Sequence, residues 1–143
     1  ASLQVKFSKD YTLGHSPLLQ SRMLAAGWWT LNRDKILKSN ADFWVFVLPS
    51  FVEKKNSYII LSPAELNRRF KAIHGASKTR IQSYLRVTKT NRCWEARGLP
   101  RADEELIALD RFSDKNRDFT VFLDAWKQIE SQLKGSARKS KKK

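Results

Sequence analysis

The sequence predicts an α/β domain with a mixed central sheet and helices on its faces. Two continuous apolar runs, residues 42–48 and 57–61, are typical of strands buried on both sides. Around them lie segments whose apolar residues recur at helical spacing, one of them opened by a capping box at residues 62–65. With 143 residues, 41% of them hydrophobic, the chain is long enough for one domain with a substantial core.

The first predicted strand, residues 3–7, alternates apolar and polar side chains. This period of two places Gln4 and Lys6 on the same face of a half-buried strand. A helix should follow, because Ser16 can cap it and Pro17 suits its first position. Its apolar residues recur at Leu19, Met23 and Ala26, and it should end near Gly27.

The strand over residues 42–48 ends at Pro49, and the strand over residues 57–61 follows after a polar loop. The two strands form either a hairpin or neighbouring strands of one sheet. The capping box then opens a helix that closes at His74 and Gly75. Its apolar stripe consists of Leu66, Phe70 and Ile73.

Short β-favouring pieces between residues 81 and 97 flank a turn-like segment, residues 88–91, and predict a hairpin. Helices are expected over residues 103–112 and 116–134, the second with a continuous apolar stripe that packs on the sheet. Residues 1–134 therefore form a single domain. Residues 135–143 are rich in like charges and predict a disordered basic tail, either native or added at cloning.

The chain carries 28 basic and 14 acidic residues, a formal net charge of +14, which favours polyanionic partners. Nucleic acid is the first candidate and an anionic membrane surface the second. The single cysteine, Cys93, excludes an internal disulfide, and two histidines are too few for a zinc-ligand cluster. Without a signal peptide or a bilayer-spanning run, the chain is expected in a prokaryotic-type cytoplasm and not in a membrane. It opens inside a strand-like run without an initiator Met, so we expect a fragment.

Gln4 and Lys6 on one strand, followed by a helix and then the buried strand over residues 42–48, resemble the PD-(D/E)xK, or restriction-endonuclease-like, nuclease superfamily in its QxK form. The resemblance covers roughly residues 3–75. It implies a restriction-endonuclease-like mixed sheet flanked by helices and truncated at the N-terminus. It also implies Mg²⁺ as cofactor, because this ion neutralises charge at the scissile phosphate.

By this resemblance, Gln4 is a metal ligand through its amide oxygen and Lys6 is the catalytic lysine. The family's metal-site Asp is expected upstream of Ala1, so the isolated chain should be inactive or nearly so. Asp10 and Asp42 are the early substitutes, and neither lies where the family places its acid. The alternative interpretation is that Gln4 and Lys6 form the solvent face of an edge strand, where lysine discourages pairing.

Further basic residues are candidates for phosphate contacts, with ordinary surface charge as the alternative. Those that follow the first strand are Lys9, His15, Arg22 and Lys35. Those on the predicted hairpin are Arg86, Lys89 and Arg92, together with Arg80 and Arg97, and the aromatic residues Tyr84 and Trp94 lie among them. Trp28 and Trp29 are adjacent and cannot point the same way, so one of them is a candidate for base stacking, with burial of both in the core as the alternative.

The function expected from these features is part of a Mg²⁺-dependent DNA endonuclease of a restriction, defence or DNA-processing type. A non-catalytic module that binds DNA or RNA through the same basic surface is the main alternative. A domain that docks an acidic protein partner is a third. Cutting both strands of a duplex usually needs two sites, which leaves a homodimer among the open oligomeric states.

Overall fold

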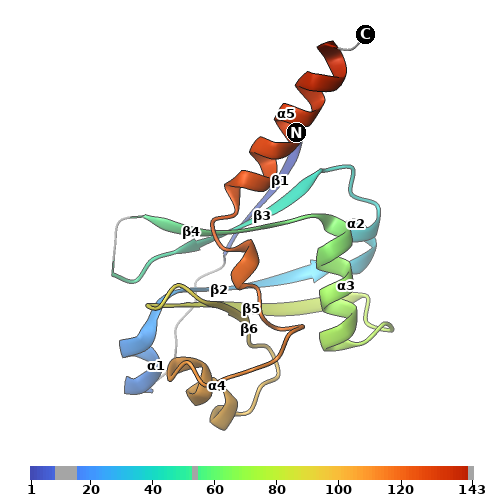
Figure 1. Ribbon diagram of the computed structural model, residues 1–143. Helices are drawn as coiled ribbons and strands as arrows, with labels where there is room; N and C mark the ends of the chain where they lie inside the picture. The colour runs from blue at the N-terminus through green and yellow to red at the C-terminus, as the bar shows by residue number, and fades with distance from the viewer. Residues whose placement is uncertain (9–15, 53–54, 142–143) are drawn as a thin grey trace.

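The structure, a computed structural model, describes residues 1–8, 16–52 and 55–141 (Figure 1). Its elements combine short helices with strands in mixed order, as expected for the α/β class. Along the chain they are β1 (Leu3–Phe7), α1 (Pro17–Arg22), β2 (Met23–Asn32), α2 (Arg33–Leu37), β3 (Phe43–Pro49), β4 (Asn56–Leu61), α3 (Pro63–His74), β5 (Arg80–Thr88), β6 (Cys93–Glu95), α4 (Arg101–Ala108), the 3₁₀ helix η1 (Thr120–Phe122) and α5 (Trp126–Lys141).

The strands of the described residues form two three-stranded sheets. In the first, β3 pairs in parallel with β1 on one side and antiparallel with β4 on the other. In the second, β5 lies between β2 and β6 and is antiparallel to both. The single central sheet predicted from the sequence is therefore corrected to two sheets, because β2 forms its ladder with β5 and does not extend the sheet that contains β3.

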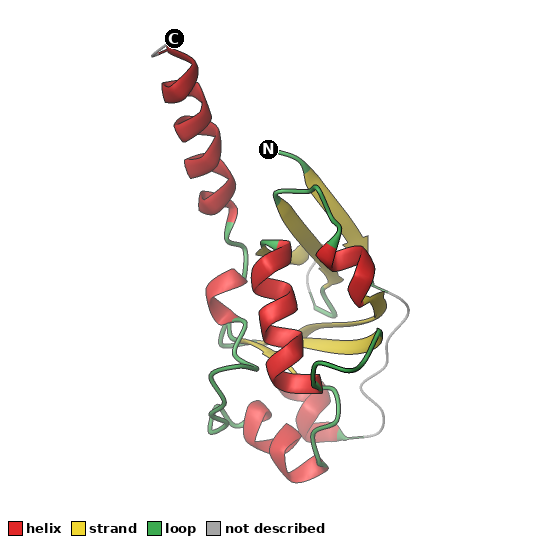
Figure 2. Cartoon of the chain, turned by 90° about the vertical axis from the view of Figure 1, so that its right-hand side faces the viewer, coloured by secondary structure: helices red, strands yellow, loops and turns green. Residues whose placement is uncertain are grey.

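The two sheets pack against each other around a shared apolar core. Trp29 and Leu85 reach this core from the second sheet, and Phe46 and Leu61 reach it from the first. Leu66 and Phe70 of α3 complete the core, and all of these side chains are almost fully buried. Figure 2 shows α3 lying across the sheets, whereas α5 extends away from them.

A second apolar cluster joins α1 and α4 to the outer face of the second sheet. It contains Leu19 of α1, Trp94 of β6 and Ile107 of α4, each of them buried. These two helices lie together at one end of the sheet (Figure 1). Among the described residues, no helix covers the other end of this face, where β2 runs into α2 and β5 begins.

The predicted helix that starts at Ser16 is shorter than expected. Ser16 does cap it, since its Oγ accepts a hydrogen bond from the Leu19 backbone N–H at 3.4 Å. The helix ends at Arg22, however, and the chain continues from Met23 as β2. Helical spacing of apolar residues predicted that this helix ends near Gly27. The segment forms a strand instead, because it pairs with β5 and because its tryptophan and threonine residues favour β structure.

Several other predictions are confirmed. β3 and β4 form an antiparallel pair, and β5 and β6 form the expected hairpin around the turn that follows Thr88. The helix α3 begins as predicted, with the Ser62 Oγ accepting a hydrogen bond of 3.2 Å from the Glu65 N–H. It ends at Gly75, whose φ of +89° suits glycine.

The C-terminal part differs from its prediction. The expected helix over residues 116–134 begins only at Trp126, because the preceding segment is tied to both sheets. The Phe119 N–H donates to the Cys93 carbonyl at 2.9 Å, and Leu123 forms an isolated bridge with Ile59. Phe119 is buried there, and Ile129 is half-buried against the apolar side chains of β3 and β4, whereas Trp126 and Leu133 are exposed. The helix α5 also continues to Lys141, where the sequence favoured a disordered tail, because serine, alanine, arginine and lysine do not interrupt a helix.

Within the part of the chain that the structure describes, no helix combines the length and the apolar character needed to cross a bilayer.

Candidate nucleic-acid interface

The strand β1 presents its polar side chains toward the second sheet. In the parallel register Gln4 lies opposite Trp44 and Lys6 opposite Phe46, and both aromatic residues belong to the core between the sheets. Directly paired residues share a face of a sheet, so Gln4 and Lys6 lie on this face as predicted. The Lys6 ammonium lies 5.3 Å from the centroid of the Trp44 ring, within cation–π distance.

Lys6 borders a hollow that several elements of the fold build together. We call it the Lys6 hollow; its volume is about 250 Å³. Its lining residues are Lys6 of β1, Thr30, Leu31 and Asn32 of β2, Lys35 of α2, Trp44 of β3 and Arg80 of β5. The structure thus brings together three of the candidate residues, Lys6, Lys35 and Arg80. Gln4 is exposed and is not among the lining residues, so the structure does not bring it into this hollow with Lys6.

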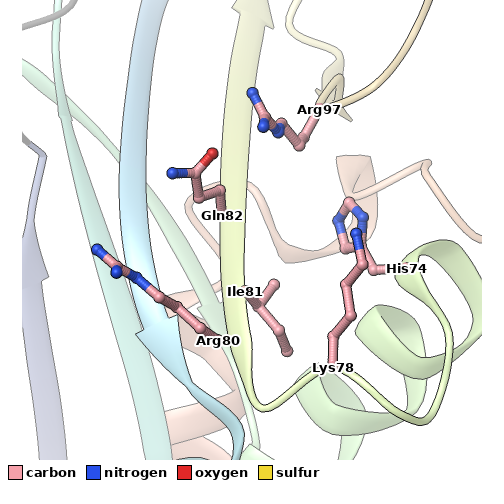
Figure 3. Close-up of a pocket in the computed structure, with 6 residues that line it drawn as sticks. All are labelled: His74, Lys78, Arg80, Ile81, Gln82 and Arg97. Atoms are coloured by element: carbon pink, nitrogen blue, oxygen red, sulfur yellow. The ribbon is translucent and has the colours of Figure 1, made fainter.

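A second hollow lies beside the first, and we call it the His74 pocket. It has a volume of about 350 Å³ and is lined by His74, Lys78, Arg80, Ile81, Gln82 and Arg97. Figure 3 shows Arg80 extending from β5 over β2 and Gln82 pointing toward β2, while His74 and Lys78 lie on the other side of β5. Because Arg80 lines both hollows, they adjoin each other at the end of the sheet that α1 and α4 leave open.

The register of β2 and β5 explains why polar groups gather on this outer face. Asn32 pairs with Arg80, Thr30 with Gln82 and Trp28 with Tyr84. The residues between them in sequence, including Trp29 and Ile81, point into the core. Trp28 and Trp29 therefore face opposite ways, as predicted, and Trp28 is the half-buried one.

Aromatic and basic side chains are in contact on this face. The ring centroids of Trp28 and Tyr84 are 6.4 Å apart in an edge-on arrangement. The Arg97 guanidinium lies 5.1 Å from the centre of the Tyr84 ring, and its Nη1 donates a hydrogen bond of 2.8 Å to the Tyr84 hydroxyl. Such a surface combines positive charge with aromatic rings, the two features that bind single strands.

Most arginines elsewhere are held by carboxylates. Arg68 and Arg69 both pair with Glu65, and Arg117 lies between Glu95 and Asp114. By contrast, the cations of the two hollows have no carboxylate within ion-pair distance among residues 1–8, 16–52 and 55–141. They are Lys6, Lys35, Lys78, Arg80 and Arg97. Their charge is therefore directed at solvent and at any anion that enters the hollows.

Two residues of the expected basic and aromatic surface on the hairpin, Arg86 and Trp94, are buried. Arg86 is only 5% exposed, and its Nη2 lies 2.9 Å from Oε1 of Glu104 on α4. Trp94 is equally buried, in the cluster with α4. Arg92 stacks over the Trp94 ring at 5.0 Å and pairs with Asp118 at 3.5 Å. These contacts hold the part of the hairpin near its turn to α4 and to the segment before η1, so the basic and aromatic residues that stay open are Arg80, Tyr84 and Arg97.

The remaining predicted contacts lie elsewhere. Arg22 and Lys89 are exposed neighbours at the far end of the second sheet, where the Lys89 N–H donates to the Arg22 carbonyl at 2.9 Å. A phosphate contact at Arg22 and Lys89, separate from the two hollows, stays a prediction. Lys9 and His15 fall outside the described residues.

The residues present do not by themselves fit Mg²⁺. The described part of the chain contains no group of three or more histidine, cysteine or acidic residues that could hold a metal ion. The Lys6 hollow is lined by several cations and Gln4 is not among its lining residues, whereas Mg²⁺ prefers carboxylate oxygens. Asp42 lies away from this hollow, where its carboxylate accepts a 2.8 Å hydrogen bond from the Ser2 N–H that lowers its pKa. An acidic ligand from upstream of Ala1 remains a prediction.

Cys93 is not a ready nucleophile either. Its side chain is fully buried, and burial raises the pKa of the thiol well above its ordinary value. The thiolate, which is the reactive form, is therefore disfavoured.

Comparison of the chain with models of protein families, with curated proteins and with solved structures finds no match. The two hollows and the open part of the second sheet are therefore the features of the molecule that point to a function.

Proposed function

We propose that this chain is a nucleic-acid-binding domain and that the Lys6 hollow holds a backbone phosphate. The observation that carries the proposal is the convergence of Lys6, Lys35 and Arg80, from three separate elements, on one hollow. Cations placed this way neutralise a phosphate and release its counterions, which is the main source of sequence-independent affinity. The net charge of +14 adds long-range attraction to the same ligand.

The open face next to the hollow suggests how the strand continues. Trp28 and Tyr84 lie on the same face as Arg80, so a chain whose phosphate enters the hollow can place bases near these rings. Asn32 and Gln82 add amide groups that can hydrogen-bond to bases or sugars. We therefore expect single-stranded DNA or RNA to bind more tightly than duplex DNA of equal length.

The test is fluorescence anisotropy of labelled oligonucleotides with the 143-residue chain and its variants. We expect Lys35→Ala and Arg80→Ala each to weaken binding by about tenfold. In a plot of the logarithm of the binding constant against the logarithm of the salt concentration, each variant should make the slope shallower by about one. The charge-matched controls are Arg101→Ala and Lys127→Ala, exposed residues of α4 and α5 outside both hollows. Equal losses in all four variants would show only non-specific attraction and would overturn the proposal.

Hydrolysis of DNA is the second candidate function. The observation in its favour is that Gln4 and Lys6 share the face of β1 that turns toward the second sheet, while Lys6 lines the hollow. In this proposal Mg²⁺ would need acidic ligands from beyond the described residues. Lys6 would stabilise negative charge on the phosphate that is cleaved.

A cleavage assay of the complete reading frame with Mg²⁺ separates the two candidates. If the protein is a nuclease, Lys6→Ala abolishes cleavage while affinity falls no more than in Lys35→Ala. If the protein only binds, no cleavage occurs with either metal or chelator present, and Lys6→Ala behaves like Lys35→Ala. Cleavage that survives in Lys6→Ala at its full rate would refute the proposed role of this lysine.

A further inference from the structure

We propose that the His74 pocket binds a phosphomonoester dianion, either at the end of a nucleic-acid strand or on a free nucleotide. This inference deepens the proposed function and rests on it, because the pocket shares Arg80 with the Lys6 hollow. It assigns the two hollows different ligands, a backbone phosphodiester in the Lys6 hollow and a terminal phosphate in the His74 pocket.

The charge of the pocket favours a dianion. Lys78, Arg80 and Arg97 bring three permanent positive charges to its wall. A phosphodiester carries one negative charge, whereas a phosphomonoester carries about 1.5 to 2 negative charges at neutral pH and three strong acceptor oxygens. The surplus of cations is therefore better matched by the monoester.

One carboxylate lies behind the pocket and does not cancel this charge. Glu95 has no exposed surface, and its Oε2 lies 2.5 Å from Nε2 of His74. Its Oε1 accepts a 2.5 Å hydrogen bond from the Arg97 backbone N–H, and the Arg117 guanidinium lies 3.8 Å away. Glu95 is thus a positioning residue, since it holds the imidazole of His74 and the backbone that carries Arg97 on one side of the pocket.

The loop that carries Lys78 is held as well. Arg33 is 8% exposed, and its guanidinium donates hydrogen bonds to the carbonyl oxygens of Gly75, at 2.6 Å, and Ala76. Its backbone N–H donates to the Thr79 carbonyl at 2.7 Å. The segment between α3 and β5 is therefore fixed at both ends, so Lys78 starts from a backbone that is already ordered. Binding then requires less loss of conformational entropy.

The dimensions also fit a nucleotide. A volume of about 350 Å³ exceeds that of a phosphate alone and lies in the range of small-ligand sites, roughly 300 to 1,000 Å³. Gln82 contributes an amide group to the lining, and Tyr84 with its stacked Arg97 borders the same face. A phosphate held by the cations would leave its nucleoside next to these groups.

The experiment compares oligonucleotides of one sequence with a 5′-phosphate, a 3′-phosphate or hydroxyl groups at both ends. Anisotropy measures their affinity for the unaltered chain, for Lys78→Gln and for Lys127→Gln. We expect one terminal phosphate to raise affinity about tenfold, as one well-placed charge-assisted contact would. Lys78→Gln should reduce the ratio of the affinities for the phosphorylated and hydroxyl oligonucleotides to about two or less. Lys127 is an exposed residue of α5, and Lys127→Gln should leave this ratio unchanged.

Competition by a mononucleotide and by its nucleoside identifies the source of the phosphate. Stronger competition by the mononucleotide shows that a free nucleotide enters the pocket, while an effect of the terminal phosphate without such competition shows that a strand end is required. Equal binding of the phosphorylated and hydroxyl oligonucleotides overturns the inference and leaves nucleic-acid binding intact. Failure of every oligonucleotide and of the mononucleotide to bind overturns both.

Discussion

Trp29 Nε1 donates a hydrogen bond of 3.0 Å to the carbonyl oxygen of Phe7, the last residue of β1. The same indole packs edge-on against Phe46 at 5.0 Å between ring centroids. One side chain of the second sheet therefore fixes the end of an edge strand of the first, one residue beyond Lys6. The position of Lys6 relative to Lys35 and Arg80 depends on this contact between the sheets.

Trp29→Phe should weaken both stability and nucleic-acid binding. It removes the hydrogen bond to Phe7 and some packing, which we expect to cost about 1 to 3 kcal/mol of unfolding free energy. Ile59→Val, in the core of β4, is the matched control, because it costs a comparable amount, about 0.5 to 1.5 kcal/mol, without touching β1. Denaturant melts should show a loss in both variants, and anisotropy should show weaker binding for Trp29→Phe alone. Unchanged affinity in Trp29→Phe would mean that β1 does not depend on this contact.

Gly27→Ala tests the same junction from the backbone. A Cβ at Gly27 would lie 2.7 Å from Ser8 Oγ and 2.7 Å from Cη2 of Trp29, distances that require something to shift. The Ser8 hydroxyl also accepts a 3.1 Å hydrogen bond from the Trp28 N–H, so moving it disturbs a second contact. We expect a loss of about 1 to 3 kcal/mol in stability. Gly135→Ala, which meets nothing within 4 Å, should be neutral or slightly stabilising in the same melts.

Glu65 should make stability depend on pH. Its hydrogen bond to Arg68, together with Arg69, lowers the pKa of the carboxyl below its ordinary value of 4.5 against the opposing effect of desolvation. Because the pKa is lower in the folded state, the contribution to stability is complete above the unfolded value and is lost as pH falls through the folded value. The difference in unfolding free energy between the unaltered chain and Glu65→Gln should therefore be present at pH 7 and shrink below about pH 4. Glu130→Gln, on the exposed side of α5, should show no such change, and a constant difference for Glu65→Gln would contradict the assignment.

Elements specified by short stretches of sequence could be predicted. The apolar run that becomes β3 and the Ser62 cap of α3 contain their own signals, and both elements form where expected. β2 could not be predicted, because its residues also fit a helical period. It forms a strand because it pairs with β5, which lies about 55 residues further along the chain. The segment around Phe119 was mistaken for a helix for the same reason, since bridges to β4 and β6 fix its conformation.

The candidate site was predictable in part. The period of two in β1 placed Gln4 and Lys6 on one face, and Lys35 was among the expected phosphate contacts. The place of Arg80 in the hollow depends on the register that sets it opposite Asn32, which no local pattern reveals. Arg80 and Arg86 have the same parity on β5, so the sequence could not show which of them α4 covers.

That difference between Arg80 and Arg86 gives a direct test of the interface. Arg86→Ala removes the partner of Glu104 under α4, and we expect a loss of about 1 to 3 kcal/mol in stability, because a partly buried carboxylate is left without its ion pair. Arg80 is exposed, so Arg80→Ala should leave stability within about 0.5 kcal/mol. Affinity should show the opposite order at a temperature where both variants are folded: reduced in Arg80→Ala and unchanged in Arg86→Ala. Since each variant removes one arginine from the same face of the same strand, their net charge is identical. An equal loss of affinity in both variants would therefore indicate non-specific attraction, and a loss in Arg86→Ala alone would place the interface at the α4 end of the sheet and not at the hollows.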